Sequence, residues 1–170
     1  LLMPGRRGDY ERLRSALGRA LEELQRQFRA AGIDVVEPER ELAGQFPGGD
    51  LEGTADLVVR NQSGRQAIVD MKWAGANVHQ DRLAKNRHLQ LALYAEMLRQ
   101  ETGAWQQVSY FILEASRLLA PDSGFFPEAL SVQSRTTGAT PQLWEQFLTA
   151  WKWRRSQIDA GMVEVVSEGI

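Results

Sequence analysis

Two aspartates and a lysine lie within two stretches that otherwise have largely the composition of apolar β-strands. Asp56 lies in "LEGTADLVVRN", whereas Asp70 and Lys72 lie in "QAIVDMKW". Charged side chains in such runs are costly unless they are paired or bind a metal. The residues between the runs, "NQSG", are typical of a hairpin turn. The two runs are therefore expected to pair as antiparallel strands.

A hairpin centred near Ser63 would place Asp56 opposite Asp70, since the two are equally distant from it. Two facing carboxylates repel each other unless a cation lies between them. Mg²⁺ or Mn²⁺ takes oxygen ligands, so a pair of aspartates suits either ion. Lys72 would leave the same face as Asp70. It could orient or help deprotonate an attacking water, or stabilise charge developing on a phosphate.

The alternative is a cross-strand ion pair between Asp56 and Lys72 on a solvated face, because short motifs recur by chance. The strand around Asp70 is apolar on both faces, as in a central strand covered by helices. This setting favours the metal site over the solvated pair.

A second pattern lies downstream, in "NRHLQLALYAEMLRQ". Gln90 and Tyr94 are four residues apart and therefore share one face of the expected helix. They interrupt a surface that is otherwise apolar. Taken alone, the segment is typical of an amphipathic helix with two polar residues at its boundary.

Taken in order, "G-T-A-D", "I-V-D-M-K" and "Q-L-A-L-Y-A" resemble three motifs of the PD-(D/E)XK nuclease superfamily, specifically its RecB-like exonuclease branch. That branch carries a G-x-x-D strand, a D-x-K strand and a following helix with Q-x-x-x-Y. The resemblance covers roughly residues 35–98. It implies an α/β (α+β), restriction-endonuclease-like fold with an αβββαβ core and a mixed central sheet flanked by helices. A further helix is appended at the C-terminal end.

The resemblance also implies roles for individual residues. The metal ligands would be Asp56, Asp70 and the backbone carbonyl of Met71. Lys72 would be the catalytic lysine that activates water. Gln90 and Tyr94 would support the site and contact the DNA strand being cut.

Two features of the chain concern additional ligands. Glu41, or with less support Glu39, lies where some family members carry a further acidic ligand. RecB-like nucleases often have a histidine before the G-x-x-D strand, but the two histidines here, His79 and His88, both follow it. His79 falls in an expected loop, where it could reach the site but is more typical of a solvated side chain. The chain has no cysteine, which excludes an iron–sulfur cluster within it.

Three basic residues, Arg82, Lys85 and Arg87, precede Gln90 and could form a lip that holds DNA phosphates. An ordinary charged helix turn explains them equally well. Near the C-terminal end, Trp153 lies among basic residues. It could stack on a single strand, although docking or plain surface is the favoured interpretation.

The remaining elements follow from periodicity and turn residues. A helix is expected from an N-cap at Asp9 to about Ala31, then a strand in "IDVVEPERELAG" with an irregularity at Pro38, and a turn in "QFPGGD". A loop is expected in "AGANVHQDR", and a helix from about Asp81 to Thr102. Then follow a strand in "WQQVSYFILEA", a loop in "PDSGFF", a short edge strand in "LSVQSR" and a helix from Thr140 to Gly161. Trp144, Phe147 or Leu148, and Trp151 form a stripe expected to pack in the core.

Composition narrows the class of protein. The 170 residues fit one domain, here expected to span 1–170. Initiation at "LLMPG" suggests a fragment of a longer protein, with a cloning or ordering artefact as the alternative. A net charge of −2 argues against a protein that coats nucleic acid by electrostatic attraction alone. No run has the length of a membrane span and no signal peptide is visible, so a cytoplasmic location is compatible.

These observations favour a Mg²⁺- or Mn²⁺-dependent DNA nuclease, specifically an exonuclease module of a recombination or repair protein. Its expected partners are DNA and the remainder of a larger helicase–nuclease, with no membrane. The alternative is a catalytically inactive nuclease fold that acts as a DNA-binding or scaffold module of such a complex.

Overall fold

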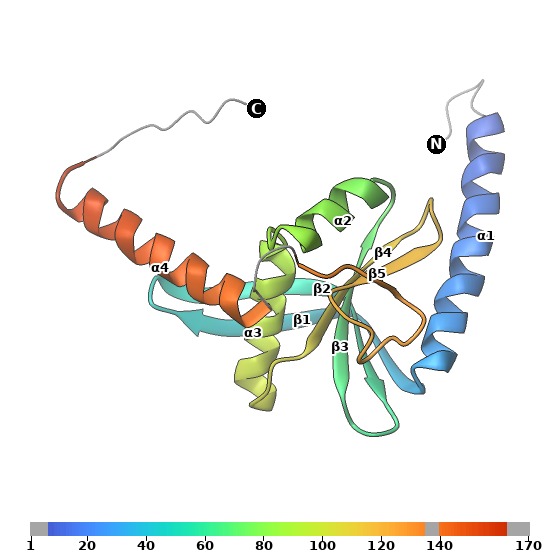
Figure 1. The fold of residues 1–170 in the computed structure, drawn as a ribbon, viewed down its shortest axis with the longest axis horizontal. Helices are drawn as coiled ribbons and strands as arrows, with labels where there is room; N and C mark the ends of the chain where they lie inside the picture. Colours follow the sequence, from blue (N-terminus) through green and yellow to red (C-terminus); the bar gives the residue numbers. More distant parts are fainter. Residues whose placement is uncertain (1–6, 135–139, 163–170) are drawn as a thin grey trace.

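The computed structural model describes residues 7–134 and 140–162 (Figure 1). Its helices are α1 (Arg7–Ala30), α2 (Ala76–Ala84), α3 (Leu89–Thr102) and α4 (Thr140–Asp159). Its strands are β1 (Ile33–Phe46), β2 (Gly49–Asn61), β3 (Gln66–Lys72), β4 (Gln107–Ile112), β5 (Arg117–Ala120) and β6 (Leu130–Ser131).

The strands form one mixed sheet in the order β1-β2-β3-β4-β5-β6. The first three strands are consecutive antiparallel neighbours. The chain then crosses over through α2 and α3 and returns as β4, parallel to β3. This arrangement confirms the expected α+β class and the αβββαβ core with a mixed sheet flanked by helices. The crossover places the carboxyl ends of β3 and β4 at the same edge of the sheet.

Two hydrophobic cores lie on opposite faces of the sheet. On one face, Val58 and Ile68 pack with leucines of α2 and α3. On the other face, Val59 and Val69 pack with Ala20 and Leu24 of α1. Alternate residues of a strand point to opposite faces, so β3 is buried on both sides. It is therefore the covered central strand that its apolar composition predicts.

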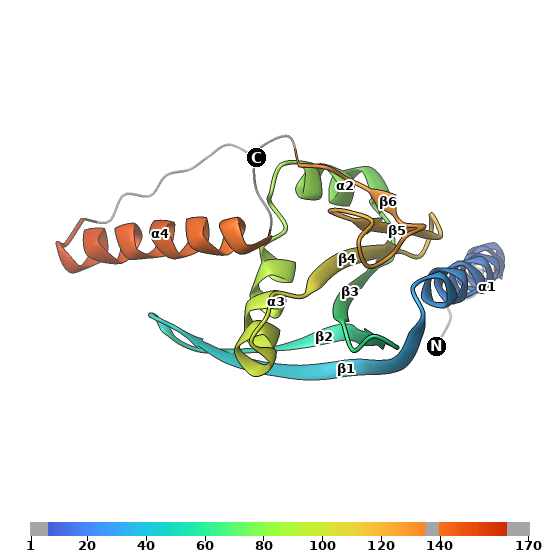
Figure 2. The same ribbon diagram turned by 60° about the horizontal axis from the view of Figure 1, so that its bottom comes forward.

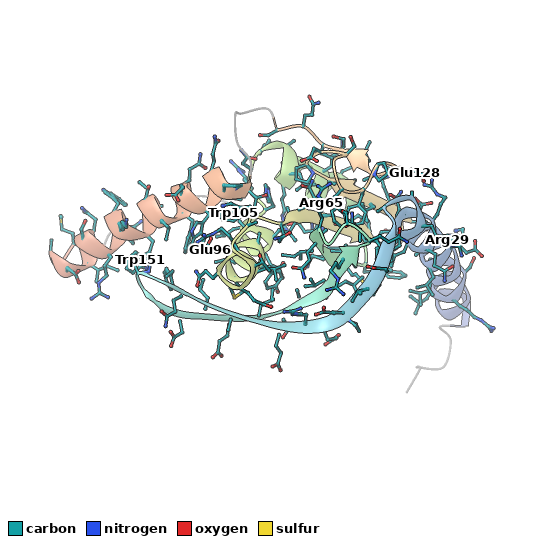
Figure 3. All side chains as sticks on the ribbon, turned by 90° about the horizontal axis from the view of Figure 1, so that it is seen from below. Arg29, Arg65, Glu96, Trp105, Glu128 and Trp151 are labelled. Atoms are coloured by element: carbon teal, nitrogen blue, oxygen red, sulfur yellow. The ribbon has the colours of Figure 1, made fainter. Side chains whose placement is uncertain are left out.

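The β1–β2 pair extends beyond the rest of the sheet as a long, curved arm that runs beneath α3 (Figure 2). Residues of α4 hold its tip: Phe46 lies 6.1 Å from Phe147 and 5.4 Å from Trp151, between ring centroids. Figure 3 shows Trp151 beside this tip. Trp144 is buried and stacks on Phe147. The predicted core packing of this stripe therefore holds for Trp144, whereas Phe147 and Trp151 are half-buried and pack on the tip of the arm.

The segment "AGANVHQDR" is a helix in the structure, so the prediction of a loop there is wrong. Helix α2 follows Gly75, whose φ of 87° is left-handed, and no side chain caps its first turn. Asp81 lies inside α2, and α3 begins only after His88. A helix without a capping side chain lacks the start signal on which a prediction depends.

Smaller differences concern the ends of elements. Helix α1 begins at Arg7, so Asp9 lies within it rather than before it. The expected single strand in "WQQVSYFILEA" stops at Ile112, and a second strand, β5, returns after a tight turn at Ser116. Ser116 has a φ of 47°. This turn was missed because it lacks the glycine or asparagine that usually adopts such a conformation. Part of the expected edge strand "LSVQSR" is β6, and residue 135 lies outside the described residues.

Helix α3 lies close to the arm at Gly53. A methyl group at this position would lie 2.9 Å from Cε1 of Tyr94 and 3.4 Å from Cε of Met97. Glycine is therefore the residue that allows α3, and with it Tyr94, to lie directly against β2.

We expect Gly53→Ala to lower the free energy of unfolding by about 1–3 kcal/mol, because the added methyl group overpacks the α3–β2 contact. Urea denaturation measures the change. Gly18→Ala is the matched control: no atom lies within 4 Å of its added Cβ in the interior of α1. That variant should gain roughly 0.5–1 kcal/mol. Equal stability of Gly53→Ala and the wild type would show that the contact with Tyr94 is loose.

Candidate active site

The β2–β3 hairpin has the register that its turn predicts. Leu57 pairs with Val69 and Arg60 pairs with Gln66. Asp56 and Asp70 are the next residues along each strand. Oδ2 of Asp56 accepts a hydrogen bond of 2.6 Å from the backbone N–H of Met71. The hairpin thus brings the two aspartates to the same end of the strand pair.

Asp70 is a buried carboxylate, only 2% exposed. Lys72 Nζ lies 2.7 Å from its Oδ2 in an ion pair, with the lysine side chain 27% exposed. Burial raises the pKa of Asp70, Lys72 opposes that rise, and the charge of Asp56 adds to it. The effect of Asp56 on the pKa of Asp70 has the sign expected when two carboxylates lie near each other.

Lys72 links the aspartates to α3. Its Nζ lies 3.3 Å from Oε1 of Gln90, and Nε2 of Gln90 donates to the hydroxyl of Tyr94 over 3.1 Å. Tyr94 in turn lies against Gly53. Side-chain contacts therefore connect Asp70, Lys72, Gln90 and Tyr94, and Asp56 is joined to them through the backbone N–H of Met71. The alternative of an ion pair between Asp56 and Lys72 does not describe the structure, because the lysine pairs with buried Asp70 instead.

A tyrosine and a histidine complete the buried surroundings of Asp70. Tyr110 lies beside Asp70 across the parallel β3–β4 pairing. Its ring centroid is 4.6 Å from that of His79 on α2. Burial, with the charge of Asp70, raises the pKa of Tyr110 to about 12, while nearby Arg82 opposes the rise. Burial, with the positive charges of Arg82 and Lys72, lowers the pKa of His79.

The interpretation of His79 as a solvated loop residue is wrong. It is 7% exposed, because α2 places it against Tyr110. Tyr110, which lies across the sheet from Asp70 and contacts His79, was not predicted as part of the site. No local signal gives the parallel register of β3 and β4, and the apolar strand "VSYFI" contains no motif.

The alternation of side chains between the two faces of β2 is broken at Asp56. Ala55 packs in the core beneath α3, whereas Leu57 packs in the core on the other face. Two residues apart on a regular strand would share a face. Opposite Asp56, the ladder skips Glu39, whose φ is 50°. Such a conformation is uncommon for a residue other than glycine. The irregularity predicted at Pro38 thus occurs one residue later, directly across from the first aspartate.

The two glutamates considered as further ligands are both exposed on β1. Glu41 pairs with Thr54, and Glu39 lies opposite Asp56. Among the residues that the structure describes, no three His, Cys, Asp or Glu side chains are gathered closely enough to hold a metal ion. Neither glutamate therefore completes a three-carboxylate cluster with the aspartates.

The donor set nevertheless suits a hard divalent cation. Oδ2 of Asp70 is buried and lies 2.7 Å from Nζ of Lys72, so a cation bound there would share this oxygen with the lysine or displace the lysine from it. Two aspartates with a neighbouring backbone carbonyl supply the oxygen ligands that Mg²⁺ or Mn²⁺ prefers, with water completing the shell.

The three basic residues proposed to hold phosphates are all exposed. Arg82 lies on α2, near Tyr110. Lys85 caps the end of α2 and forms an ion pair of 2.9 Å with Asp81. Arg87 lies in the short link between α2 and α3.

Comparison with known proteins adds a family assignment. The model of the PD-(D/E)XK nuclease superfamily matches residues 3–166, nearly the whole chain. The chain belongs to this superfamily. The mixed sheet flanked by helices is therefore that of a PD-(D/E)XK nuclease fold. This confirms the resemblance seen in the sequence at the level of the superfamily.

The other comparisons are more distant. A search of curated proteins finds no match. One similar solved structure is the crystal structure of "Putative exonuclease" from Eubacterium rectale, which is 17% identical with a TM-score of 0.39. The match covers 90% of this chain and 62% of that one. This chain thus spans less than two-thirds of the matched structure. Within residues 7–134 and 140–162, no helix is long and apolar enough to cross a membrane.

The buried carboxylate predicts a pH dependence of stability in the absence of divalent metal. Because the folded pKa of Asp70 is raised above its ordinary value of 3.8, the folded state binds this proton more tightly than the unfolded state. The wild type should therefore lose stability relative to Asp70→Asn as the pH rises from about 3.8 through the raised pKa. Urea denaturation of both proteins with a chelator, from pH 3.5 to 7.5, isolates Asp70 because other carboxylates are common to both. A wild type that instead gains relative stability with pH would show that the Lys72 ion pair outweighs burial.

Proposed function

We propose that this member of the PD-(D/E)XK superfamily is a Mg²⁺- or Mn²⁺-dependent deoxyribonuclease. In this proposal it is a RecB-like exonuclease module that works in DNA recombination or repair. The observation that carries the proposal is the buried Asp70 carboxylate. It is 2% exposed, forms an ion pair with the ammonium of Lys72 and lies close enough to Asp56 for the charge of that residue to raise its pKa.

In this proposal, Asp56, Asp70 and the backbone carbonyl of Met71 hold the cation. When bound, such a cation stabilises the charge that develops on the phosphate during hydrolysis. Asp56 is already oriented by the N–H of Met71, so its free oxygen is fixed in place. The low exposure of Asp70 keeps competing water away from its buried oxygen.

Lys72 would act on the attacking water. Its amine is held between Asp70 Oδ2 and Gln90 Oε1, at 2.7 and 3.3 Å, so its position is set from two sides. From there the ammonium can orient a water molecule and stabilise the negative phosphate, whereas it could receive a proton from that water only after losing one of its own. Gln90 and Tyr94 would position the lysine and contact the DNA strand.

The surroundings would select the substrate by charge. Arg82, Lys85 and Arg87 lie along α2 and its link to α3, and we propose that they contact phosphates along the bound strand. Arg82 also lies near Tyr110, so its contact with DNA would be coupled to the buried group next to Asp70. The proposed partners are DNA and the remainder of a larger helicase–nuclease, in the cytoplasm.

One observation favours a second candidate, a DNA-binding or scaffold module without catalysis. The described residues gather two carboxylates but no third His, Cys, Asp or Glu. The absence of a histidine before the G-x-x-D strand in the given sequence also favours this candidate. In this case the aspartates would not bind a cation.

We expect the purified chain, alone or with the rest of its parent protein, to degrade linear DNA when Mg²⁺ or Mn²⁺ is present. Asp70→Asn or Lys72→Ala should lower the rate by about 10²–10⁴-fold, the usual contribution of a positioned acid or base. Both variants should remain folded, with a cooperative thermal transition like that of the wild type. Release of labelled nucleotides measures the rate.

Lys152→Ala on α4 is the matched control, because this lysine is exposed and far along the chain from the site; its rate should not change. Isothermal titration with Mn²⁺ separates the two candidates. Heat of binding that disappears in Asp70→Asn supports the nuclease. DNA that stays intact, together with no carboxylate-dependent heat, would establish the scaffold instead.

A further inference from the structure

Tyr110 places a buried hydroxyl group in strand β4, beside the candidate active site. Its side chain is 2% exposed, and its partner in the parallel β3–β4 pairing is Asp70. A hydroxyl that is taken out of water lowers stability unless it gains a hydrogen bond. Phenylalanine would fill nearly the same volume without that cost. The hydroxyl of Tyr110 is therefore expected to have a polar partner.

That partner is the guanidinium of Arg82. Burial raises the pKa of Tyr110, and Arg82 lies close enough to the hydroxyl to oppose this rise through its charge and a side-chain hydrogen bond. Helix α2 sets the approach. His79 lies three residues before Arg82, so the two share a face of the helix, and the ring centroid of His79 is 4.6 Å from that of Tyr110. One face of α2 thus contacts Tyr110 through both residues.

The charge of Arg82 lies near the candidate catalytic groups in space, and not only along the chain. Besides burial, the charges of Arg82 and Lys72 both lower the pKa of His79, so both cations lie near its imidazole. Lys72 is 2.7 Å from Asp70, and the charge of Asp70 in turn raises the pKa of Tyr110. Arg82 is therefore a second cation beside the pair that Asp70 and Lys72 form.

The partner of Arg82 is neutral, which leaves its positive charge uncancelled. Among the described residues, Arg82 forms no ion pair with a carboxylate. By contrast, the ammonium of Lys85, one turn further along α2, lies 2.9 Å from Asp81. A phenol carries no charge at neutral pH, and the pKa of Tyr110 is raised to about 12. The hydroxyl can therefore orient the guanidinium while the charge remains available to an anion.

A guanidinium held in this way suits a phosphodiester. It is planar and has several N–H donors, so one edge can bond to the hydroxyl while another binds phosphate oxygens. A long exposed side chain loses rotamer freedom when it binds a ligand, and a contact that orients it beforehand reduces this cost. The hydroxyl of Tyr110 would therefore strengthen a contact between Arg82 and DNA without touching the DNA.

We propose that Tyr110 is a positioning residue, whose hydroxyl holds Arg82 so that the guanidinium binds a phosphate of the DNA strand at Asp70 and Lys72. This inference rests on the proposed nuclease function. It assigns the phosphate contact nearest the reacting groups to Arg82 and explains why β4 carries a tyrosine at this position.

The test measures DNA binding without cleavage, in the 170-residue chain that carries Asp70→Asn. Adding Arg82→Ala should weaken binding to labelled linear DNA by about 10- to 100-fold, the range expected for a hydrogen bond to a charged group. The slope of log Kd against log salt concentration should become shallower by about 0.7–0.9, the value for one phosphate contact. Arg82→Lys should restore this slope, because it restores the charge.

Tyr110→Phe keeps the ring that packs against His79 and removes only the hydroxyl. It should weaken binding by about 3- to 10-fold, as expected for one hydrogen bond. The same change should cost less than about twofold when Arg82 is already alanine, since the hydroxyl then has nothing to position. A hydroxyl that served only the fold would cost the same affinity in both backgrounds.

Lys152→Ala on α4 is the control for the loss of an exposed charge, and it should leave the affinity within about twofold of the parent's. Four results would each overturn the inference: equal losses from Tyr110→Phe in the two backgrounds, no loss from Tyr110→Phe, a loss with Lys152→Ala as large as with Arg82→Ala, or no measurable DNA binding by the parent. Cleavage by the wild type is scored separately. A chain that binds DNA through Arg82 but never cuts it would refute the proposed hydrolysis and leave the role of Tyr110 standing.

Discussion

The structure depends on a charged carboxylate buried at the end of its central strand. Asp70 is 2% exposed, its neighbour Asp56 repels it, and Lys72 only partly offsets the cost of its burial. A chain selected for stability alone would place an apolar residue here, since replacing a buried ion pair by packed apolar groups is often neutral or stabilising. The cost indicates that the site serves a function, and a divalent cation is the ligand that would make both carboxylates favourable.

Several other elements of the fold position these groups. The β2–β3 hairpin sets the two aspartates, and α3 sets Gln90 and Tyr94 against the lysine. The crossover through α2 and α3 brings β4 alongside β3, which places Tyr110 and His79 around Asp70. Helix α4 pins the far end of the arm through its aromatic side chains. The hairpin, α3, the crossover and α4 thus each contact a different part of the sheet.

The sequence predicts the parts of this arrangement that depend on local chemistry. The "NQSG" turn sets the register of the hairpin, so the approach of Asp56 to Asp70 follows from residue spacing alone. Helical spacing likewise places Gln90 and Tyr94 on one face. The superfamily was recognisable because these local features occur in order.

What the sequence does not predict depends on contacts between distant segments or on elements without start signals. Helix α2 begins without a capping side chain, so His79 was expected in a loop and its burial could not be foreseen. Tyr110 lies next to Asp70 only because the long crossover sets the parallel register of β3 and β4. The reversal of facing at Asp56 and the left-handed Glu39 depend on the curvature of the whole arm.

The central claim is that Asp56 and Asp70 together bind one divalent cation. A crystal structure of the chain with Mn²⁺, with anomalous scattering recorded for manganese, tests it most directly. We predict an anomalous peak between the two carboxylates, about 2.1 Å from an oxygen of each, with the backbone carbonyl of Met71 as a third protein ligand. Carboxylates that point to different sides of the molecule, or a site without a peak at saturating Mn²⁺, would contradict the account.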